Sequence, residues 1–302
     1  MKTIVVADPI DIEAIDLLKT QGFEVMDLSK EKNKLIQFLP TASGLIVRSA
    51  TKATKELLDK APELQIIGRA GVGLDNIDLD ECKNRGIVVV NSPEGPTRSV
   101  AELALTMMIT VARNLGEVYS GTKAGEWPKN IKGKELHGKT LGIIGSGAIG
   151  GTFARYAIAI GMSVLAYDII KYSDLEELDQ FRYVSLEELY TNSDVISMHV
   201  PLLPATNHMI NQEAISKMKK GVIILNTSRG GVIDENALLD GLNSGIVYGA
   251  GLDTFENEPV KKDQPLIQHP KVFATAHIGA QTKEANKKNS IIISEKIINH
   301  FK

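Results

Sequence analysis

The 302-residue sequence contains one cysteine, Cys82, and one tryptophan, and aromatic residues make up only 5% of it. A single cysteine cannot form an internal disulfide or a cluster of metal-binding thiolates, so we predict no metal site and expect Cys82 to be a half-buried helix residue. No apolar run reaches the length of about 20 residues that a membrane-spanning helix needs, and the N-terminus lacks a signal-peptide pattern. These absences predict a cytoplasmic protein.

The chain also lacks a strong charge of either sign. It has 34 Lys and Arg against 37 Asp and Glu, a net charge of −3. This balance argues against nucleic acid or a membrane surface as a partner. The hydrophobic share of 43% and the charged share of 24% are ordinary for a globular protein, and the length allows two domains.

The most informative stretch lies between residues 140 and 168. An apolar run at Leu141–Ile144 predicts a buried strand, and the glycine-rich turn Gly145–Gly150 follows directly. A helical pattern at Phe153–Ile160 and a second apolar run at Met162–Tyr167 come next, and the run ends on Asp168. This order of strand, glycine turn, helix, strand and carboxylate is typical of a dinucleotide-binding fold. The alternative is a glycine-rich turn in another α/β protein, such as a methyltransferase.

Each part of this motif has a physical role in binding a dinucleotide. Gly145 allows the tight turn, Gly147 lets the backbone approach a pyrophosphate, and Gly150 lets the helix pack against the strand. The N–H groups at the helix start, including those of Ala148 and Ile149, face the phosphate charge. Asp168 can accept the ribose hydroxyls and would repel a 2′-phosphate, which predicts NAD rather than NADP.

Strand and helix patterns alternate along the whole chain, which predicts parallel sheets covered by helices. In residues 1–90, strands are expected at Ile4–Ala7, Phe23–Met26, Gly44–Val47, Ile66–Ile67 and Ile87–Val90, and helices at Ile12–Thr20, Lys32–Phe38, Lys55–Lys60 and Asp78–Arg85. A turn at Asn91–Pro96, a long helix at Ser99–Asn114 and an irregular segment at 116–138 follow. Later strands are expected at Asp194–Met198, Val222–Asn226, Val247–Leu252 and Val272–Ala276.

The last helical pattern, Lys283–Phe301, is followed by no strand, so we expect it to return to the first domain and bury its isoleucines there. The prediction is an α/β protein with two doubly wound parallel sheets. A Rossmann domain at 98–280 is inserted into a flavodoxin-like substrate domain formed by 1–97 and 281–302. A substrate cleft between the domains is expected, with closure about 91–97 and 278–282.

Three strand ends in the second half carry polar side chains suited to catalysis. They deliver Arg229, the acidic segment with Glu258, and His277 to the edge of the sheet where ligands bind in open α/β folds. Arginine can bind a carboxylate and polarise a carbonyl. Histidine can transfer a proton near neutral pH, and a neighbouring carboxylate can hold its ring. His137, His208, His269 and His300 are predicted to be surface residues.

The motifs together resemble the D-isomer-specific 2-hydroxyacid dehydrogenases over essentially the whole chain. The resemblance is carried by the glycine turn with Asp168, by HVPL from His199, NTSRGG from Asn226, DTFENEP from Asp253 and TAHIGA from Thr275. It implies that Arg229 binds the substrate's carboxylate and carbonyl while Glu258 pairs with the catalytic His277. Further cofactor contacts are implied at His199, Pro201, Thr206, Thr227, Ser228, Asp253 (near the nicotinamide carboxamide) and Gly279.

Within that family, the first domain is similar to phosphoglycerate dehydrogenases, in LIVRSAT from Leu45 and IGRAGVGLDNID from Ile67. This similarity implies oxidation of D-3-phosphoglycerate, the entry to serine synthesis, by a homodimer whose contact uses the long helix and the arm after it, with Met107, Met108 and Trp127 as candidates for burial. Substrate contacts are implied at Arg48, Ser49, Arg69, Gly71, Val72 and Gly73.

Three residues depart from the family pattern: Ala276 stands where proline is usual before the histidine, Thr254 where valine is common, and Pro96 where asparagine is frequent. The chain ends at Lys302, so we expect no C-terminal regulatory domain. Two alternatives stay open: a hydroxypyruvate or glyoxylate reductase, with Arg48 and Arg69 as ordinary strand-end charges, and a corepressor-like NAD sensor that binds partners.

Overall fold

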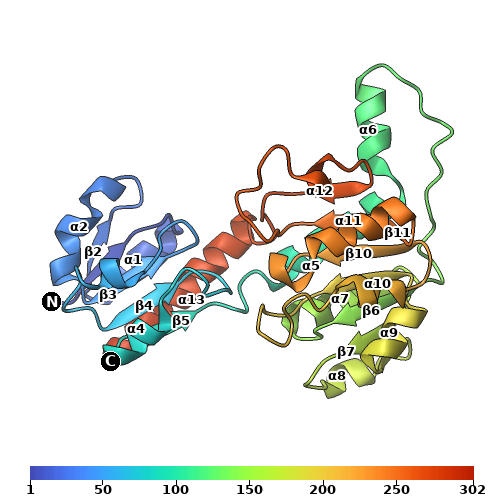
Figure 1. Cartoon of the computed structure of the whole chain (residues 1–302). Coiled ribbons are helices and arrows are strands. Elements are labelled where there is room, and N and C mark those ends of the chain that lie inside the picture. The colour runs from blue at the N-terminus through green and yellow to red at the C-terminus, as the bar shows by residue number, and fades with distance from the viewer. The chain divides into compact units, whose positions relative to one another are not determined.

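The computed structural model describes all 302 residues, and the chain divides into two compact units. The first unit combines Met1–Thr97 with Ala280–Lys302, and the second is Arg98–Gly279 (Figure 1). None of the helices combines the length and apolar character needed to cross a membrane.

The first unit is built on a five-stranded sheet in which every neighbouring pair is parallel. The strands are β1 (Thr3–Val6), β2 (Glu24–Asp27), β3 (Gly44–Val47), β4 (Ile66–Arg69) and β5 (Val88–Asn91). They lie in the order β2-β1-β3-β4-β5, which is the flavodoxin-like order. Its helices are α1 (Ile12–Thr20), η1 (Lys32–Lys34), α2 (Leu35–Phe38), η2 (Leu39–Thr41), α3 (Lys55–Leu58), α4 (Leu79–Asn84) and α13 (Lys283–Phe301).

Both faces of this sheet are apolar and covered. Alternate strand residues point to opposite faces, so Val5 and Leu45 join one core and Ile4 and Ile46 join the other. The second of these cores includes Ile293 and neighbouring isoleucines of α13, which packs on α1 and β4. The C-terminal helix therefore returns to the first unit, as its unpaired apolar face predicts.

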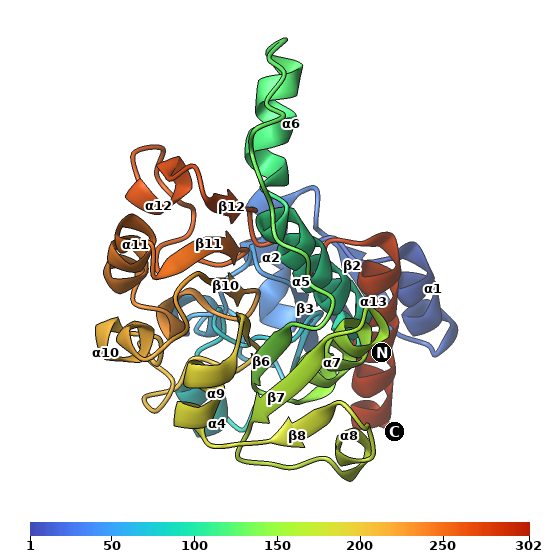
Figure 2. The same ribbon diagram turned by 90° about the vertical axis from the view of Figure 1, so that its right-hand side faces the viewer.

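The second unit contains a seven-stranded parallel sheet (Figure 2). Its strands are β6 (Thr140–Ile144), β7 (Ser163–Tyr167), β8 (Phe181–Tyr183), β9 (Val195–Met198), β10 (Val222–Asn226), β11 (Val247–Leu252) and β12 (Val272–Ala274). The order β12-β11-β10-β9-β6-β7-β8 is that of a Rossmann sheet extended by one strand. The strand order reverses between β6 and β9, which is where such sheets bind dinucleotides.

Helices cover both faces of this second sheet. The helices of this unit are α5 (Thr97–Ala112), α6 (Leu115–Lys123), α7 (Ala148–Ala159), α8 (Ser173–Glu176), α9 (Leu186–Asn192), α10 (Gln212–Ser216), η3 (Gly230–Val232), α11 (Glu235–Ser244) and α12 (Pro265–Gln268). Residues of α9, α10 and α11 share one core with Ile144 and Ile196, whereas α5, α7 and α8 share the other with Ile143 and Leu225. Within this unit α6 stands away from the sheet (Figure 2) and has no buried residue.

The predicted and observed bounds are identical for β3, β10, β11, α1 and α13. The bounds of the other predicted strands differ from the observed ones by one or two residues. Two predictions of secondary structure were wrong. Helix α7 begins at Ala148 rather than Phe153, because Gly150 and Gly151 pack tightly there despite their low helix propensity. The segment 116–138, expected to be irregular, contains nearly all of α6, in which the Thr122 hydroxyl donates to the carbonyl of Val118.

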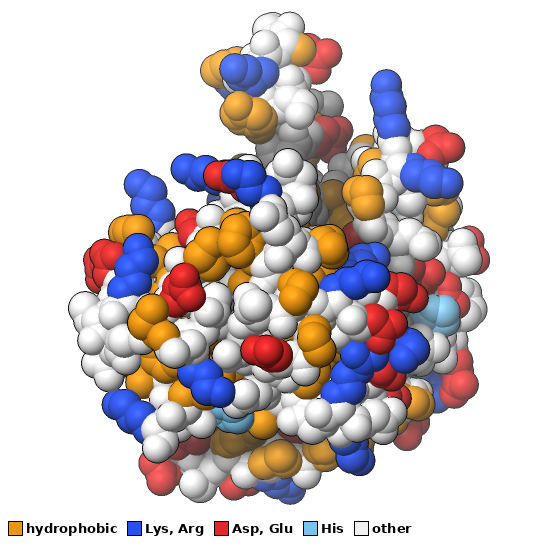
Figure 3. All heavy atoms as spheres, turned by 90° about the vertical axis from the view of Figure 1, so that its left-hand side faces the viewer, with side chains coloured by type: hydrophobic (Ala, Val, Ile, Leu, Met, Phe, Trp, Pro, Cys, Tyr) orange, Lys and Arg blue, Asp and Glu red, His pale blue; other side chains and the backbone are white.

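Two smaller points concern burial and surface charge. Cys82 is fully buried in α4 and not half-buried, because it packs among Leu58, Ile77 and Ile87. On the face drawn in Figure 3, acidic and basic side chains alternate with apolar ones, and neither charge gathers into one extended patch.

Candidate functional site

The glycine-rich turn after β6 is shaped by contacts that no side chain could tolerate. Gly145 has a positive φ of 92°, and a Cβ there would lie 2.6 Å from the carbonyl oxygen of His199. A Cβ on Gly150 would lie 2.0 Å from the Gly145 carbonyl oxygen. A Cβ on Gly147, in contrast, would meet only the Tyr172 hydroxyl at 3.9 Å. The space beside Gly147 is therefore open for a ligand, at the start of a helix whose first turn has no side-chain cap.

Asp168 follows β7 and faces the turn. One carboxylate oxygen accepts hydrogen bonds from the Ser146 amide, at 2.6 Å, and the Ser146 hydroxyl, at 3.2 Å. The other accepts from the Ile170 amide at 3.0 Å. Ser146 also contacts the Tyr183 hydroxyl at 2.9 Å, and that hydroxyl accepts from the Tyr172 amide. Neither Ser146 nor Tyr183 could be assigned to the site from the sequence, because nothing local signals that β8 lies near the turn.

His199 follows β9 at the point where the strand order reverses. Its Nε2 lies 2.9 Å from the Ser197 hydroxyl, and its ring packs edge-on against Phe153. Burial lowers the pKa of His199 to about 4, so the ring is neutral at physiological pH. After it, the Thr206 hydroxyl donates to the Pro201 carbonyl at 2.6 Å and closes a loop beside the turn.

The loop after β10 is organised by Asn226, which is buried. Its side-chain oxygen accepts from the Ser228 amide and hydroxyl, and its amide nitrogen donates to the carbonyl of Arg229 at 2.8 Å. The Arg229 guanidinium in turn donates to the Ser228 carbonyl at 2.7 Å. Thr227 has a buried hydroxyl oxygen without a hydrogen-bond partner in the chain, which is what a ligand-binding hydroxyl requires. Asn226 is thus a supporting residue of the site that was not among the predicted site residues.

Asp253 holds the segment that carries His277. Its buried carboxylate accepts from the Thr275 hydroxyl at 2.6 Å, the Ile278 amide at 2.7 Å and the Gly279 amide at 2.8 Å. The Asp253 carbonyl accepts from the His277 amide at 2.9 Å. His277 has a φ of 53°, a conformation that few side chains adopt. Four hydrogen bonds to one residue stabilise this conformation.

His277 and Glu258 form a direct pair. Nδ1 of His277 lies 2.8 Å from one carboxylate oxygen of Glu258. The other carboxylate oxygen accepts a hydrogen bond from the Phe255 amide at 3.0 Å. The Glu258 hydrogen bond raises the pKa of His277 against the opposing effect of partial burial. Partial burial alone would raise the pKa of Glu258, but the bonds from His277 and Phe255 hold it below its usual value. The positive charge of Arg229 lowers the pKa of both groups.

This arrangement leaves the reactive atom of the histidine free. With Nδ1 bonded to Glu258, Nε2 has no partner in the chain and can exchange a proton with a ligand. A pocket of about 610 Å³ lies beside the pair, lined by Val260, Ile267 and Ala274 among others. The second unit thus brings together a histidine with a free ring nitrogen, its carboxylate partner and an arginine.

The first unit carries the residues predicted to bind substrate, at the ends of β3 and β4. Arg48 is half-buried, and its guanidinium makes no hydrogen bond or ion pair within the chain. Burial lowers its pKa, whereas the charge of Asp8 raises it. Ser49, the next residue, is exposed.

Arg69 lies against the glycine loop that follows it. A Cβ on Gly71 would overlap a terminal nitrogen of Arg69, and Gly71 has a φ of 149°. The carbonyl of Val72 accepts a hydrogen bond from the side chain of Asn91, the last residue of β5. The carbonyl of Gly71 accepts one from the amide of Ser92, which follows β5. The amides of Val72 and Gly73 donate to no group of the chain. This geometry suits an anion bound by backbone N–H groups beside an arginine.

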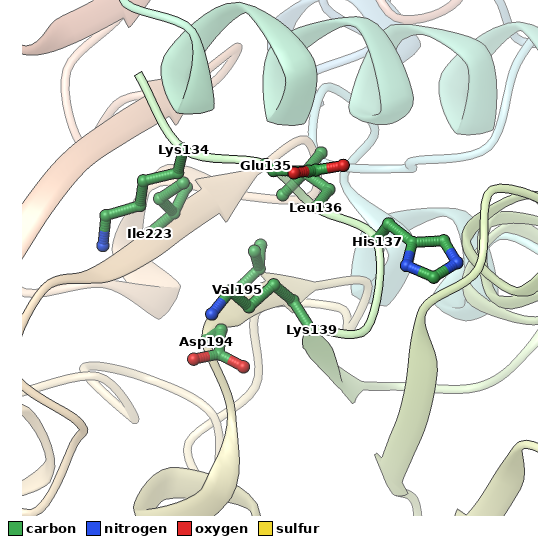
Figure 4. Close-up of a pocket in the computed structure, with 8 residues that line it drawn as sticks. All are labelled: Lys134, Glu135, Leu136, His137, Lys139, Asp194, Val195 and Ile223. Atoms are coloured by element: carbon green, nitrogen blue, oxygen red, sulfur yellow. The ribbon is translucent and has the colours of Figure 1, made fainter. Parts of the chain in front are cut away.

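Another pocket lies at the opposite, amino-terminal edge of the second sheet (Figure 4). Two of its charged groups, Lys134 and Asp194, are already engaged in structural contacts. Lys134 stacks on the Tyr248 ring and donates to the Gly221 carbonyl, and Asp194 accepts from the Thr140 amide and from Lys219. We therefore assign no reaction to it.

Four histidines were predicted to be surface residues. His137 and His300 are exposed, as expected. His208 and His269 are half-buried, because His208 pairs with Glu256 at 3.1 Å and His269 accepts from the Lys271 amide. None of the four contacts His277 or Glu258.

The second unit fits an NAD cofactor. The open space beside Gly147, the uncapped start of α7, the Asp168 carboxylate beside the turn and the unpartnered Thr227 hydroxyl match what a dinucleotide needs. Such a cofactor, when bound, supplies or accepts the hydride.

Comparison with known proteins agrees with this geometry. Residues 105–279 match the family described as the D-isomer specific 2-hydroxyacid dehydrogenase, NAD binding domain. A hydroxypyruvate reductase from Thermotoga maritima is 48% identical over 97% of this chain and 96% of that protein. A D-3-phosphoglycerate dehydrogenase from Methanocaldococcus jannaschii is 43% identical over 98% of this chain, which spans only 57% of that protein.

A solved structure gives the same result. The D-lactate dehydrogenase from Aquifex aeolicus, crystallised with NAD and lactic acid, is 35% identical with a TM-score of 0.82, over 99% of this chain and 94% of that one. The chain therefore belongs to the D-isomer-specific 2-hydroxyacid dehydrogenases, enzymes that use NAD, and its second unit contains their NAD-binding domain.

Proposed function

We propose that this dehydrogenase interconverts D-3-phosphoglycerate and 3-phosphohydroxypyruvate, the oxidation that opens serine synthesis. The observation that carries the proposal is Arg48, a half-buried guanidinium with no carboxylate partner in the chain. A charged group removed from water needs a counter-charge, and a phosphate would supply one with a geometry that guanidinium matches. Arg69 and the free amides of Val72 and Gly73 add further donors in the same unit.

In this proposal the second unit carries out the chemistry. Arg229 binds the carboxylate and polarises the carbonyl oxygen at C2 of the substrate. Nε2 of His277 gives a proton to that oxygen during reduction and takes it back during oxidation. Glu258 holds the imidazole through Nδ1 and stabilises its protonated form. Asp253 acts indirectly, because its hydrogen bonds to the amides of Ile278 and Gly279 orient the segment that carries His277.

The competing proposal is a hydroxypyruvate reductase. Its specific support is the relative of that name, which matches this chain at 48% identity over nearly its full length. Hydroxypyruvate lacks the phosphate, so in that case Arg48 and Arg69 would not bind a phosphate and would be ordinary charged residues at strand ends.

Replacement of Arg48 by alanine separates these proposals. We expect KM for 3-phosphohydroxypyruvate to rise roughly 10–100-fold, because a hydrogen bond to a charged group is worth about 1.5–3 kcal/mol. KM for hydroxypyruvate should change by less than about 3-fold, since no phosphate contact is lost. The measurement is NADH oxidation with the two keto acids in parallel.

Arg85→Ala is the matched control, because Arg85 is also in the first unit but is already paired with Asp59 and Glu81. Equal effects of Arg48→Ala on both substrates would remove the phosphate assignment. A wild-type protein that binds NADH but turns over neither substrate would favour the NAD-sensor alternative.

The pH dependence follows from the His277–Glu258 pair. The protonated form of His277 is stabilised, so its pKa lies above the usual value of about 6.5, and reduction should persist until the pH rises through that raised pKa. In Glu258→Gln the pKa falls, and the alkaline limb of kcat/KM for reduction should move to lower pH. Glu256→Gln, which alters the His208 pair instead, should leave the profile in place. An unmoved limb in Glu258→Gln would contradict the acid–base assignment.

We also propose that the chain forms a homodimer through the arm at residues 115–135. Trp127 and Tyr119 on this arm are 74% and 65% exposed, and large aromatic side chains favour burial at interfaces. Met107 and Met108, expected to contribute, are already buried in the core of their own unit. We expect light scattering to give the mass of a dimer, and Trp127→Glu to shift it towards the monomer. A monomeric wild type would refute this.

A further inference from the structure

The carboxylate of Asp8 collects hydrogen bonds around the loop that carries Arg48. Asp8 follows β1 and is 1% exposed. One of its oxygens accepts from the Arg48 amide at 2.7 Å and the Thr51 amide at 3.0 Å. The other accepts from the Thr51 hydroxyl at 2.8 Å and from Lys32 at 2.7 Å. Three of these four donors belong to residues 48–51.

The same loop is held from its other side by Asn76. The side-chain amide nitrogen of Asn76 donates to the carbonyl of Arg48 at 2.7 Å and to that of Thr51 at 2.6 Å. Asp8 thus fixes the N–H groups at both ends of the loop, and Asn76 fixes the carbonyls of the same two residues. Between them, Ser49 and Ala50 are exposed. The backbone on both sides of these residues is held by hydrogen bonds, while the tip is exposed and the Arg48 side chain is half-buried.

Burial of a charged carboxylate is costly without such donors. Burial alone would raise the pKa of Asp8, but the hydrogen bonds from Lys32, Arg48 and Thr51 hold it below its usual value. The group is therefore a charged acceptor at neutral pH. Because β1 and β3 are neighbours in the sheet, the end of β1 is well placed to hold the loop that leaves β3.

We propose that Asp8 is a positioning residue for substrate binding: it fixes the 48–51 loop so that the Arg48 guanidinium is presented in one orientation to the substrate's phosphate. This inference rests on the proposed function of Arg48. Asp8 itself does not touch the substrate. Its carboxylate faces the backbone of the loop, and the charge it places near Arg48 favours the protonated guanidinium.

The test combines Asp8→Asn, Arg48→Ala and the double variant. The asparagine keeps the size of the side chain but loses the charge and one acceptor oxygen. We expect Asp8→Asn to raise KM for 3-phosphohydroxypyruvate about tenfold, with kcat and the NADH dissociation constant, measured by fluorescence titration, nearly unchanged. The double variant should show the same KM as Arg48→Ala alone, because a residue that acts only through Arg48 has nothing left to position.

Amide hydrogen exchange gives a readout that does not depend on substrate. In Asp8→Asn the amides of Arg48 and Thr51 should exchange about tenfold faster, whereas those of Val89 and Val90 in β5 should not change. Thr51→Val, which removes only the hydroxyl donor, should give the same pattern with smaller effects and serves if Asp8→Asn folds poorly. Lys32→Met is the matched control, because it removes the fourth donor, which lies outside the loop.

The outcomes separate the two claims. Unchanged exchange at Arg48 and Thr51, or KM effects of Asp8→Asn and Arg48→Ala that add in the double variant, would overturn the positioning role. A normal KM in Arg48→Ala would overturn the assignment of Arg48 to the phosphate. The role of Asp8 in substrate binding would fall with it, even if amide exchange at the loop rises in Asp8→Asn. A KM effect in Arg48→Ala with none in Asp8→Asn would overturn only the role of Asp8.

Discussion

Replacement of His277 by alanine is expected to lower kcat roughly 10²–10⁴-fold, the range that a general acid or base contributes. The histidine is the one group of the second unit with a free ring nitrogen beside Arg229 and a carboxylate on its other nitrogen. In the proposed mechanism, its loss leaves the keto acid without a proton donor. KM and the affinity for NADH should change little, because the features that suit a dinucleotide lie at Gly147, Asp168 and Thr227 rather than at this ring.

Two further variants make this result specific. His277→Asn keeps a residue that tolerates the left-handed backbone at φ 53°, so it should be equally inactive yet well folded. His300→Ala removes an exposed histidine and should retain wild-type turnover. Substantial activity in both His277 variants, with thermal unfolding unchanged, would show that another group transfers the proton.

Much of the fold could be predicted because it depends on local pattern. The buried strands of both sheets are short apolar runs, and α13 has an apolar face that no later strand could cover. Predictions failed where distant contacts decide the structure. The start of α7 contains two glycines that favour neither helix nor packing locally, yet their closeness to Gly145 and Leu175 leaves room for no larger residue.

The residues proposed to contact ligands can be identified from the sequence, whereas the residues that hold them in place mostly cannot. Strand ends bearing Arg229, Glu258 and His277 can be read from the sequence, because a parallel sheet brings strand ends to one edge. The support from Asn226, Ser146 and Asp8 cannot, because each bonds to backbone groups whose position depends on the folded sheet.

These supporting residues follow one rule. Asp8 holds the loop of Arg48, Asn226 holds the loop of Arg229, and Asp253 holds the segment of His277. In each case a buried polar side chain at the end of a strand bonds to the backbone of a loop at the same sheet edge. Functional side chains need placement within about 0.5 Å, and a loop cannot supply that alone. We infer that Asp8, Asn226 and Asp253 serve to place these loops rather than to contact the substrate.

Replacement of Arg229 by glutamine is the second change with a large expected effect. A guanidinium that binds the carboxylate and also polarises the carbonyl acts most strongly as negative charge develops on that oxygen. We expect kcat to fall about 10²–10³-fold, as for the loss of one oxyanion-stabilising donor, with an added rise in KM from the lost carboxylate contact. Steady-state kinetics with saturating NADH measure both terms.

Arg229→Lys shows which property of the arginine matters. Lysine keeps the positive charge but presents no planar fork and cannot bind the carboxylate in two places while it polarises the carbonyl. Compared with Arg229→Gln, this variant should therefore show a smaller rise in KM but nearly the same loss of kcat. Arg182→Gln is the matched control, because Arg182 lies in the same unit but pairs with Glu188 on the surface. If Arg229→Gln changed KM alone and left kcat intact, Arg229 would be an anchor for the substrate only, and the polarisation of the carbonyl would have to come from His277.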